Sequence, residues 1–146
     1  MPSWIWNIIA VFVGVFVGGI VNMILVSVGP AIVPLPEGAD VSDMEKLAAS
    51  MPLMQPINFL FPFLGHAVGT LAGAVIAARL AASWKMGLAM FIGFFFLAGG
   101  IAAINMLGGP MWFNVVDLVF AYLPMGYLGG LLGSPRAKVA AEPAAP

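Results

Sequence analysis

The chain contains no cysteine and a single histidine, His66, among its 146 residues. Without thiols it cannot form disulfides, a thiolate nucleophile, or the cysteine-based sites that hold zinc and iron–sulfur clusters. One imidazole likewise excludes a metal site built from several histidines of one subunit. We therefore expect neither a metal site nor a cofactor in this chain.

Charge is also scarce. Charged residues make up 8% of the chain, where soluble domains carry about 25%. Hydrophobic residues make up 62%, which excludes an ordinary soluble globule, whose surface needs polar residues, and a disordered chain. Five Lys and Arg against six Asp and Glu give a net charge of −1, which excludes the basic surface that nucleic-acid binding requires. An integral membrane protein, with the lipid bilayer as its first partner, remains.

The spacing of the charges predicts where the chain crosses the membrane. A membrane helix needs about 20 mainly apolar residues, and four stretches without charge are long enough or nearly so: 1–36, 47–78, 86–116 and 118–135. None shows the strict alternation of a β-barrel strand. They predict an all-α, four-helix membrane bundle over residues 1–133, with spans at about 5–28, 57–80, 86–107 and 112–133.

The signs of the charges predict the orientation. Arg79 and Lys85 flank the short turn between the second and third spans, and Arg136 and Lys138 follow the fourth. The loop over residues 29–56 is mainly acidic. Since cytoplasmic loops are enriched in Lys and Arg, we expect both termini in the cytoplasm and the acidic loop outside. Tryptophans at predicted span ends fit the interfacial preference of indoles: Trp4, Trp6, Trp84 and Trp112.

The long loop and the tail differ in composition. Within loop 29–56, Ser42 and Glu45 have the spacing of a capping box, which predicts a short amphipathic helix over residues 43–51. This helix is either a connector that shields helix ends or a lid or docking surface. Residues 134–146 are rich in Ala and Pro, which is typical of a disordered tail, here on the cytoplasmic side.

The first and third spans have similar sequences. Residues 12–30 read FVGVFVGGIVNMILVSVGP, and residues 91–110 read FIGFFFLAGGIAAINMLGGP. Both contain Gly-Gly-Ile, then Asn-Met, then Gly-Pro. They indicate two duplicated helical hairpins related by an axis along the membrane normal. The alternative is the chance resemblance that apolar sequences readily show.

Small residues predict how the helices pack. Burial from water cannot drive helix association in lipid, so close contact at small residues and hydrogen bonds must do so. Glycines spaced about four residues apart mark the expected contact faces: Gly14, Gly18, Gly65, Gly69, Gly73, Gly126 and Gly130. Pro124, inside the fourth predicted span, removes an N–H from the Phe120 carbonyl and predicts a kink there.

Polar residues inside spans are costly and mark candidate functional sites. Five of them fall in the half of the bundle nearer the acidic loop: His66, Asp117, Asn22, Asn105 and Thr70. His66 and Asp117 form the sharpest pair, because they could share a proton or bind a cation at a site open to the outside. The alternative is a buried hydrogen bond that fixes helix register. For Asn22 and Asn105 we expect interhelical hydrogen bonds.

Two segments carry a resemblance to a known group of proteins. FLFPFLGHAVGTLAGAVIAA at residues 59–78 and PMWFNVVDLVFAYLPMGYLGG at 110–130, with the earlier GGIVNM and VGP, resemble small four-span bacterial membrane proteins. The resemblance covers most of the chain except the tail. It implies a four-span fold in a bacterial inner membrane, and it implies no activity for His66 or Asp117.

The sequence thus predicts a small non-enzymatic membrane protein. We expect an accessory or structural subunit that self-associates or binds a larger membrane partner. The alternative is a small dimeric proton-coupled transporter or channel that uses the polar cluster. A lipid-modifying enzyme ranks third, because such enzymes usually present several converging ionisable groups, and only His66 and Asp117 qualify here.

Overall fold

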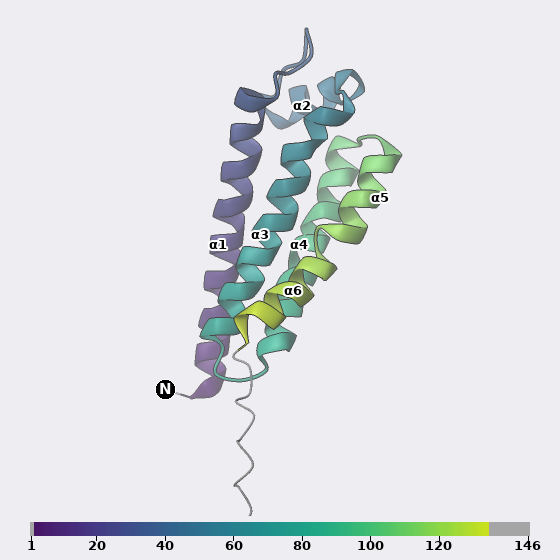
Figure 1. Ribbon diagram of the computed structural model, residues 1–146. Helices are drawn as coiled ribbons and strands as arrows, with labels where there is room; N and C mark the ends of the chain where they lie inside the picture. The colour runs from purple at the N-terminus through teal and green to yellow at the C-terminus, as the bar shows by residue number, and fades with distance from the viewer. Residues whose placement is uncertain (1, 135–146) are drawn as a thin grey trace, which may run out of the picture.

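The computed structural model describes residues 2–134 as a bundle of helices, with no β-strand among them. Figure 1 shows the elements in order: α1 (Ser3–Ile32), α2 (Met44–Ser50), the 3-10 turns η1 (Met51–Leu53) and η2 (Pro56–Phe59), α3 (Leu60–Leu80), α4 (Lys85–Leu107), α5 (Met111–Phe120) and α6 (Leu123–Gly133). The predicted all-α bundle is confirmed. The predicted tail, 134–146, lies outside the described residues except for Ser134.

Four segments are long and apolar enough to cross a membrane: Ser3–Ile32, Pro56–Leu80, Lys85–Leu107 and Met111–Gly133. The chain is thus a multi-pass membrane protein. The first segment is longer than the predicted 5–28 at both ends. At 1.5 Å per residue, α1 is about 45 Å long, which exceeds the hydrocarbon thickness of about 30 Å.

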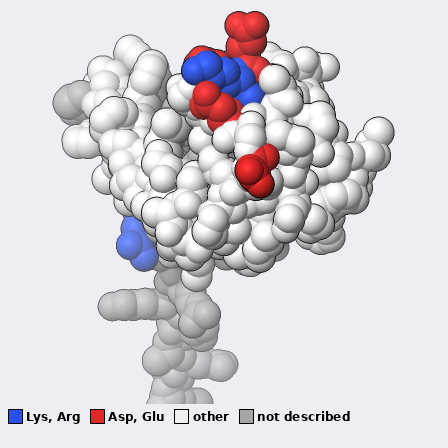
Figure 2. Space-filling view, turned by 90° about the horizontal axis from the view of Figure 1, so that it is seen from above, with Lys and Arg blue, Asp and Glu red and all other residues white. Residues whose placement is uncertain are grey.

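The helices run alternately up and down (Figure 1). The start of α1, the α3–α4 connection and the end of α6 lie at one end of the bundle, which we call the turn end. The loop between α1 and α3, with α2, lies at the other, which we call the loop end. Figure 2 views the loop end and shows acidic side chains gathered around a basic one; the loop carries Glu37, Asp40, Asp43, Glu45 and Lys46.

Polar contacts tie the turn end together. The Asn7 side-chain oxygen accepts hydrogen bonds from the backbone N–H groups of Ala82 (3.1 Å) and Ser83 (3.2 Å). The Lys85 ammonium donates to the Ala81 carbonyl at 2.6 Å, which satisfies one of the unpaired carbonyls at the end of α3. These contacts fix α1, α3 and α4 relative to one another at this end.

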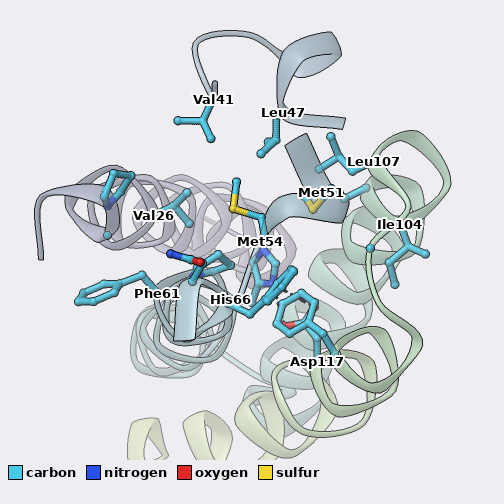
Figure 3. Close-up of a pocket in the computed structure, with 18 of the residues that line it drawn as sticks. Val26, Val41, Leu47, Met51, Met54, Phe61, His66, Ile104, Leu107 and Asp117 are labelled. Carbon is cyan, nitrogen blue, oxygen red and sulfur yellow. Dashed lines mark hydrogen bonds and ion pairs between the residues drawn. The ribbon is translucent and has the colours of Figure 1, made fainter. Parts of the chain in front are cut away.

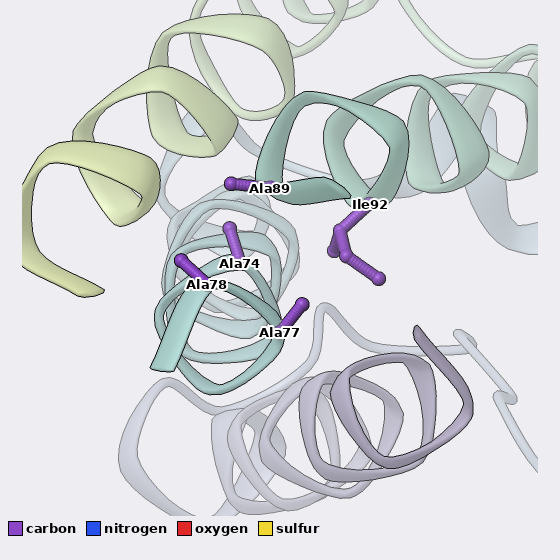
Figure 4. Close-up of a cluster of buried hydrophobic side chains, with 5 residues drawn as sticks. All are labelled: Ala74, Ala77, Ala78, Ala89 and Ile92. Atoms are coloured by element: carbon purple, nitrogen blue, oxygen red, sulfur yellow. The ribbon is translucent and has the colours of Figure 1, made fainter. Parts of the chain in front are cut away.

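Helix α3 is the centre of the bundle, because it packs against α1, α4 and α6. Figure 4 shows small side chains of α3 that point toward the neighbouring helices, with Ala89 and Ile92 of α4 beside them. This core cluster consists of Ala74, Ala77, Ala78, Ala89 and Ile92, all fully buried. Small side chains let the helix backbones approach closely, so dispersion contacts accumulate where water burial gives no advantage.

Helices α1 and α3 touch through backbone. A Cβ atom added at Gly14 would lie 2.7 Å from the Gly73 carbonyl oxygen, and one added at Gly69 would lie 2.8 Å from the Gly18 carbonyl oxygen. The two glycine stripes of the sequence therefore face each other. The glycine stripe of the fourth span packs against α4: a Cβ added at Gly126 would lie 3.2 Å from the Cα of Gly93.

The fourth span is two helices, because it breaks at Ala121–Tyr122 and resumes at Leu123. Pro124 lies in the first turn of α6, where a missing N–H costs nothing. The sequence predicts a kink at Pro124 within the span over 112–133, and the structure has the helix interrupted there, at Ala121–Tyr122. The reason is that Pro124 cannot donate to the Phe120 carbonyl, and the chain begins a new helix instead.

The two hairpins differ in the surroundings of their matching residues. Asn22 of α1 packs over Gly65 of α3, where an added Cβ would lie 2.6 Å from its side-chain oxygen. The matching Asn105 of α4 is exposed. The duplication stays a prediction, and these asparagines do not play equivalent parts.

Candidate functional site

A cavity of about 560 Å³ opens at the loop end, within the range of about 300–1,000 Å³ typical of small-molecule pockets. Its walls come from α1, α3, α4 and α5, and most of its lining side chains are apolar. Figure 3 looks into this cavity and shows Val41 and Leu47 of the loop region across from His66 and Asp117. The loop and α2 thus help to enclose a space inside the bundle.

The loop that covers the cavity is internally braced. The Asp43 carboxylate accepts a hydrogen bond from the backbone N–H of Lys46 at 2.8 Å and caps α2. The sequence predicted a helix over 43–51 with Ser42 in its capping box; the cap is Asp43, one residue later. Ser50 exchanges hydrogen bonds with the backbone of Asp40. Hydrogen bonds from Ser42 hold the pKa of the Asp40 carboxyl below its usual value, with a smaller contribution from Lys46.

Three polar side chains meet inside the bundle: His66, Asp117 and Tyr122, which we call the polar triad. The Nδ1 atom of His66 lies 2.8 Å from Oδ1 and 3.0 Å from Oδ2 of Asp117. The Tyr122 hydroxyl donates to Oδ2 of Asp117 at 2.8 Å. The structure thus brings together the pair that the sequence singled out and adds a third group.

Two members of the polar triad differ in how far their side chains are exposed. The Asp117 side chain is 3% exposed, whereas the His66 side chain is 24% exposed. Both residues line the cavity. The His66 and Tyr122 rings are stacked, with centroids 5.7 Å apart. Asp117 is therefore the more deeply buried of the two residues, and His66 is the more accessible from the cavity.

Tyr122 was missed at the level of sequence. The helix break places it, because residues five apart on a continuous helix would point about 140° apart at 3.6 residues per turn. Gly100 of α4 makes room for its ring: an added Cβ there would lie 2.5 Å from the Tyr122 hydroxyl oxygen and 2.7 Å from Cζ. The available signals were Pro124 just after Tyr122 and the Gly99-Gly100 pair on the preceding span.

The Gly100→Ala substitution is expected to push Tyr122 off Asp117 and to lower the free energy of unfolding by about 1–3 kcal/mol, as overpacking does. Thermal or denaturant unfolding in detergent measures this loss. Gly99→Ala is the matched control, because an added Cβ there meets nothing within 4 Å. Equal stability of the two variants would contradict the position assigned to Tyr122.

The other three predicted site residues form no hydrogen bond with the polar triad within the described part of the chain. Asn105 is exposed and donates to the Ile101 carbonyl of its own helix at 2.9 Å, so the predicted interhelical bond is wrong for this residue. Asn105 lies on a face of α4 that does not line the cavity. Asn22 packs against α3, and Thr70 is 1% exposed. Neither Oδ1 of Asn22 nor Oγ1 of Thr70 bonds another described residue, so the interhelical hydrogen bond predicted for Asn22 is not formed through this oxygen.

The geometry defines what the polar triad can do. A carboxylate that holds one ring nitrogen of a histidine fixes the orientation of the ring and leaves the other nitrogen for a ligand or a proton. Within residues 2–134, His66 bonds no hydroxyl group, so the arrangement of a base beside a nucleophile is not formed there. The polar triad is thus suited to holding a ligand or a proton.

Comparisons of the chain with known protein families, with curated proteins and with solved structures find no match. The resemblance to small four-span bacterial membrane proteins therefore stays a prediction.

Proposed function

We propose that this chain is a non-enzymatic integral membrane protein that binds a small apolar or amphipathic molecule at the loop end of its bundle. One observation carries the proposal: an apolar cavity of about 560 Å³ with His66 and Asp117 in its lining. Binding sites for small molecules commonly combine apolar walls with a few convergent polar groups that orient the ligand.

The packing nearer the turn end favours binding over transport through one subunit. There, α1, α3 and α4 meet through the glycine contacts and the alanine cluster. A path for ions or protons needs polar groups or water along its length, and the buried side chains of this cluster are apolar. The dimeric transporter therefore ranks second, since any path would have to run between subunits.

The setting of this binding protein is also part of the proposal. The resemblance and the basic residues Arg79 and Lys85 at the turn end favour a bacterial inner membrane with both termini in the cytoplasm. The cavity then opens outside. Much of α1 is exposed, because 17% of its most apolar 18-residue stretch is buried. This helix therefore has surface for lipid, a second copy or a larger partner. An accessory subunit fits these features.

The binding proposal predicts that filling the cavity prevents labelling inside it. Ala103 lines the cavity, whereas its neighbour Ala102 is exposed and lies outside the lining. The chain in lipid vesicles is treated with an alkyl diazirine, irradiated, digested and mapped by mass spectrometry. We expect labelling of Met54 and Ile104 in the wild-type chain, a several-fold loss in Ala103→Phe, and little change in Ala102→Phe.

Equal labelling of the cavity residues in all three chains would overturn the binding proposal. The two substitutions add the same side chain to adjacent positions of α4, so a general effect on folding or on lipid contact would act on both. Only the cavity distinguishes them.

A further inference from the structure

A second hollow adjoins the cavity at the loop end. It has a volume of about 340 Å³ and lies between the end of the loop and the start of α5, with Pro52 on the loop side and Pro110 and Trp112 on the other. Trp112 is 48% exposed, and indole side chains prefer the boundary between hydrocarbon and water. The second hollow is therefore placed where a molecule dissolved in the membrane can reach it.

The residues common to both spaces form a partition between them. Four residues line the cavity and the second hollow alike: Met51, Met54, Phe59 and Gly109. Phe59 is 5% exposed, and its ring packs against those of Trp112 and Phe113, with centroids 5.6 and 4.6 Å away. The two methionines, which Figure 3 shows among the cavity side chains, are the adaptable part of this partition, because an unbranched thioether side chain changes its shape readily.

Both methionines belong to a segment whose base is held firmly. We call residues 35–54 the lid; it contains α2 and η1. The side chain of Asn58 clamps the two ends of the lid, because its Nδ2 donates to the Pro34 carbonyl at 3.1 Å and its Oδ1 accepts from the Gln55 N–H at 2.9 Å. Asn58 lies in η2, directly before α3, so the base of the lid is fixed to the start of α3.

The opposite side of the lid has no polar attachment. The lid is braced by its own hydrogen bonds and ion pairs, such as those between Ser50 and Asp40. Within residues 2–134, none of these bonds reaches α4 or α5. Helix α2 packs against α4, and Leu47 and Leu107 both line the cavity beneath. Lifting this side of the lid therefore breaks apolar contacts alone, and the lid keeps its internal bonds as it moves.

We propose that the lid is a gate. It pivots on the Asn58 clamp, and a ligand passes from the second hollow into the cavity when Met51 and Met54 move away from α5. This inference rests on the binding function proposed above and adds how that binding site is opened. The entrance lies at the edge of the lid next to Trp112, and the clamped edge stays closed.

A tether across the second hollow tests the gate. The chain contains no cysteine, so two introduced cysteines react without competition. Pro52→Cys and Pro110→Cys place thiols on the lid and on the α5 side of the hollow, and a bifunctional methanethiosulfonate joins them through disulfides that a reductant cleaves. The control joins Glu45→Cys to Ala49→Cys, exposed positions one turn apart on α2, and leaves the lid free to move.

The order of addition separates opening from binding. Each chain in lipid vesicles receives the alkyl diazirine either before or after the cross-linker, and labelling of Ile104 in the cavity lining is measured by mass spectrometry. With the lid tethered, we expect several-fold less labelling when the probe is added second than when it is added first. Reduction of the tether should restore the labelling, which controls for folding of the variant. The control staple should give equal labelling in either order.

The outcomes distinguish this inference from the binding proposal. Equal labelling in both orders with the lid tethered would overturn the gate, and the binding function then stands if Ala103→Phe still prevents labelling of Ile104. Labelling that Ala103→Phe does not prevent would overturn both. A tether that fails to form, while the control staple forms, would contradict the position of Pro52 across the hollow from Pro110 and with it the gate.

Discussion

Gly18→Ile is expected to force α1 away from α3, whereas Gly19→Ile leaves the bundle intact. A Cβ at Gly18 would lie 2.7 Å from the Gly69 carbonyl oxygen and 2.9 Å from a ring carbon of Phe96. A Cβ at Gly19 meets nothing within 4 Å. Backbone on the far side cannot move aside as a flexible side chain can, so the helices themselves must separate.

Gly18→Ile is expected to lower the free energy of unfolding by at least about 1–3 kcal/mol, the cost of ordinary overpacking. Unfolding of detergent-solubilised protein with increasing denaturant measures it through the shift of the midpoint. Both substitutions replace Gly by the same β-branched residue in the same helix, so intrinsic helix propensity changes equally. Matching midpoints for the two variants would show that α1 and α3 do not touch at this glycine.

The composition was enough to predict the class of the fold, and the reason is physical. Scarce charges must stay outside hydrocarbon, so their spacing marks the spans, and the observed segments begin and end close to the predicted ones. The break at Ala121–Tyr122 was not predictable to the residue. Pro124 required that some carbonyl lose its partner, but a kink and a new helix both satisfy that requirement, and tertiary packing decides between them.

The candidate site was predictable in part. His66 and Asp117 stood out because ionisable residues inside spans need partners, and they are 2.8 Å apart. Asn105 resembled Asn22 in its local sequence, yet the rotation of its helix leaves it exposed. Which face of an almost wholly apolar helix turns inward is weakly encoded, because lipid and protein offer an apolar side chain similar surroundings.

The glycines of the bundle have two distinct uses. Those between α1 and α3, such as Gly14 and Gly73, bring backbones into contact. Gly100 instead makes space for the ring of Tyr122. The first use brings α1 and α3 together along much of their length, and the second admits a polar side chain into the bundle.

The largest energetic coupling in the molecule is expected between His66 and Asp117. Asp117→Leu alone removes the shared partner of the His66 ring and the Tyr122 hydroxyl. His66→Leu alone leaves the carboxyl with Tyr122 as its remaining partner within residues 2–134. Removing one member of such a pair leaves its partner unpaired in apolar surroundings, and removing both avoids part of that cost. The double variant should therefore be less destabilised than the sum of the single variants, by about 1–3 kcal/mol.

A double-mutant cycle measures this coupling as the non-additive part of the unfolding free energies in detergent. The control cycle pairs Asp117→Leu with Asn105→Leu, because Asn105 is exposed and bonds its own helix. That cycle should be additive within about 0.5 kcal/mol. Additivity in the His66 cycle would mean that the 2.8 Å contact contributes no coupling, and the imidazole would then lack the fixed orientation on which its role in the cavity depends.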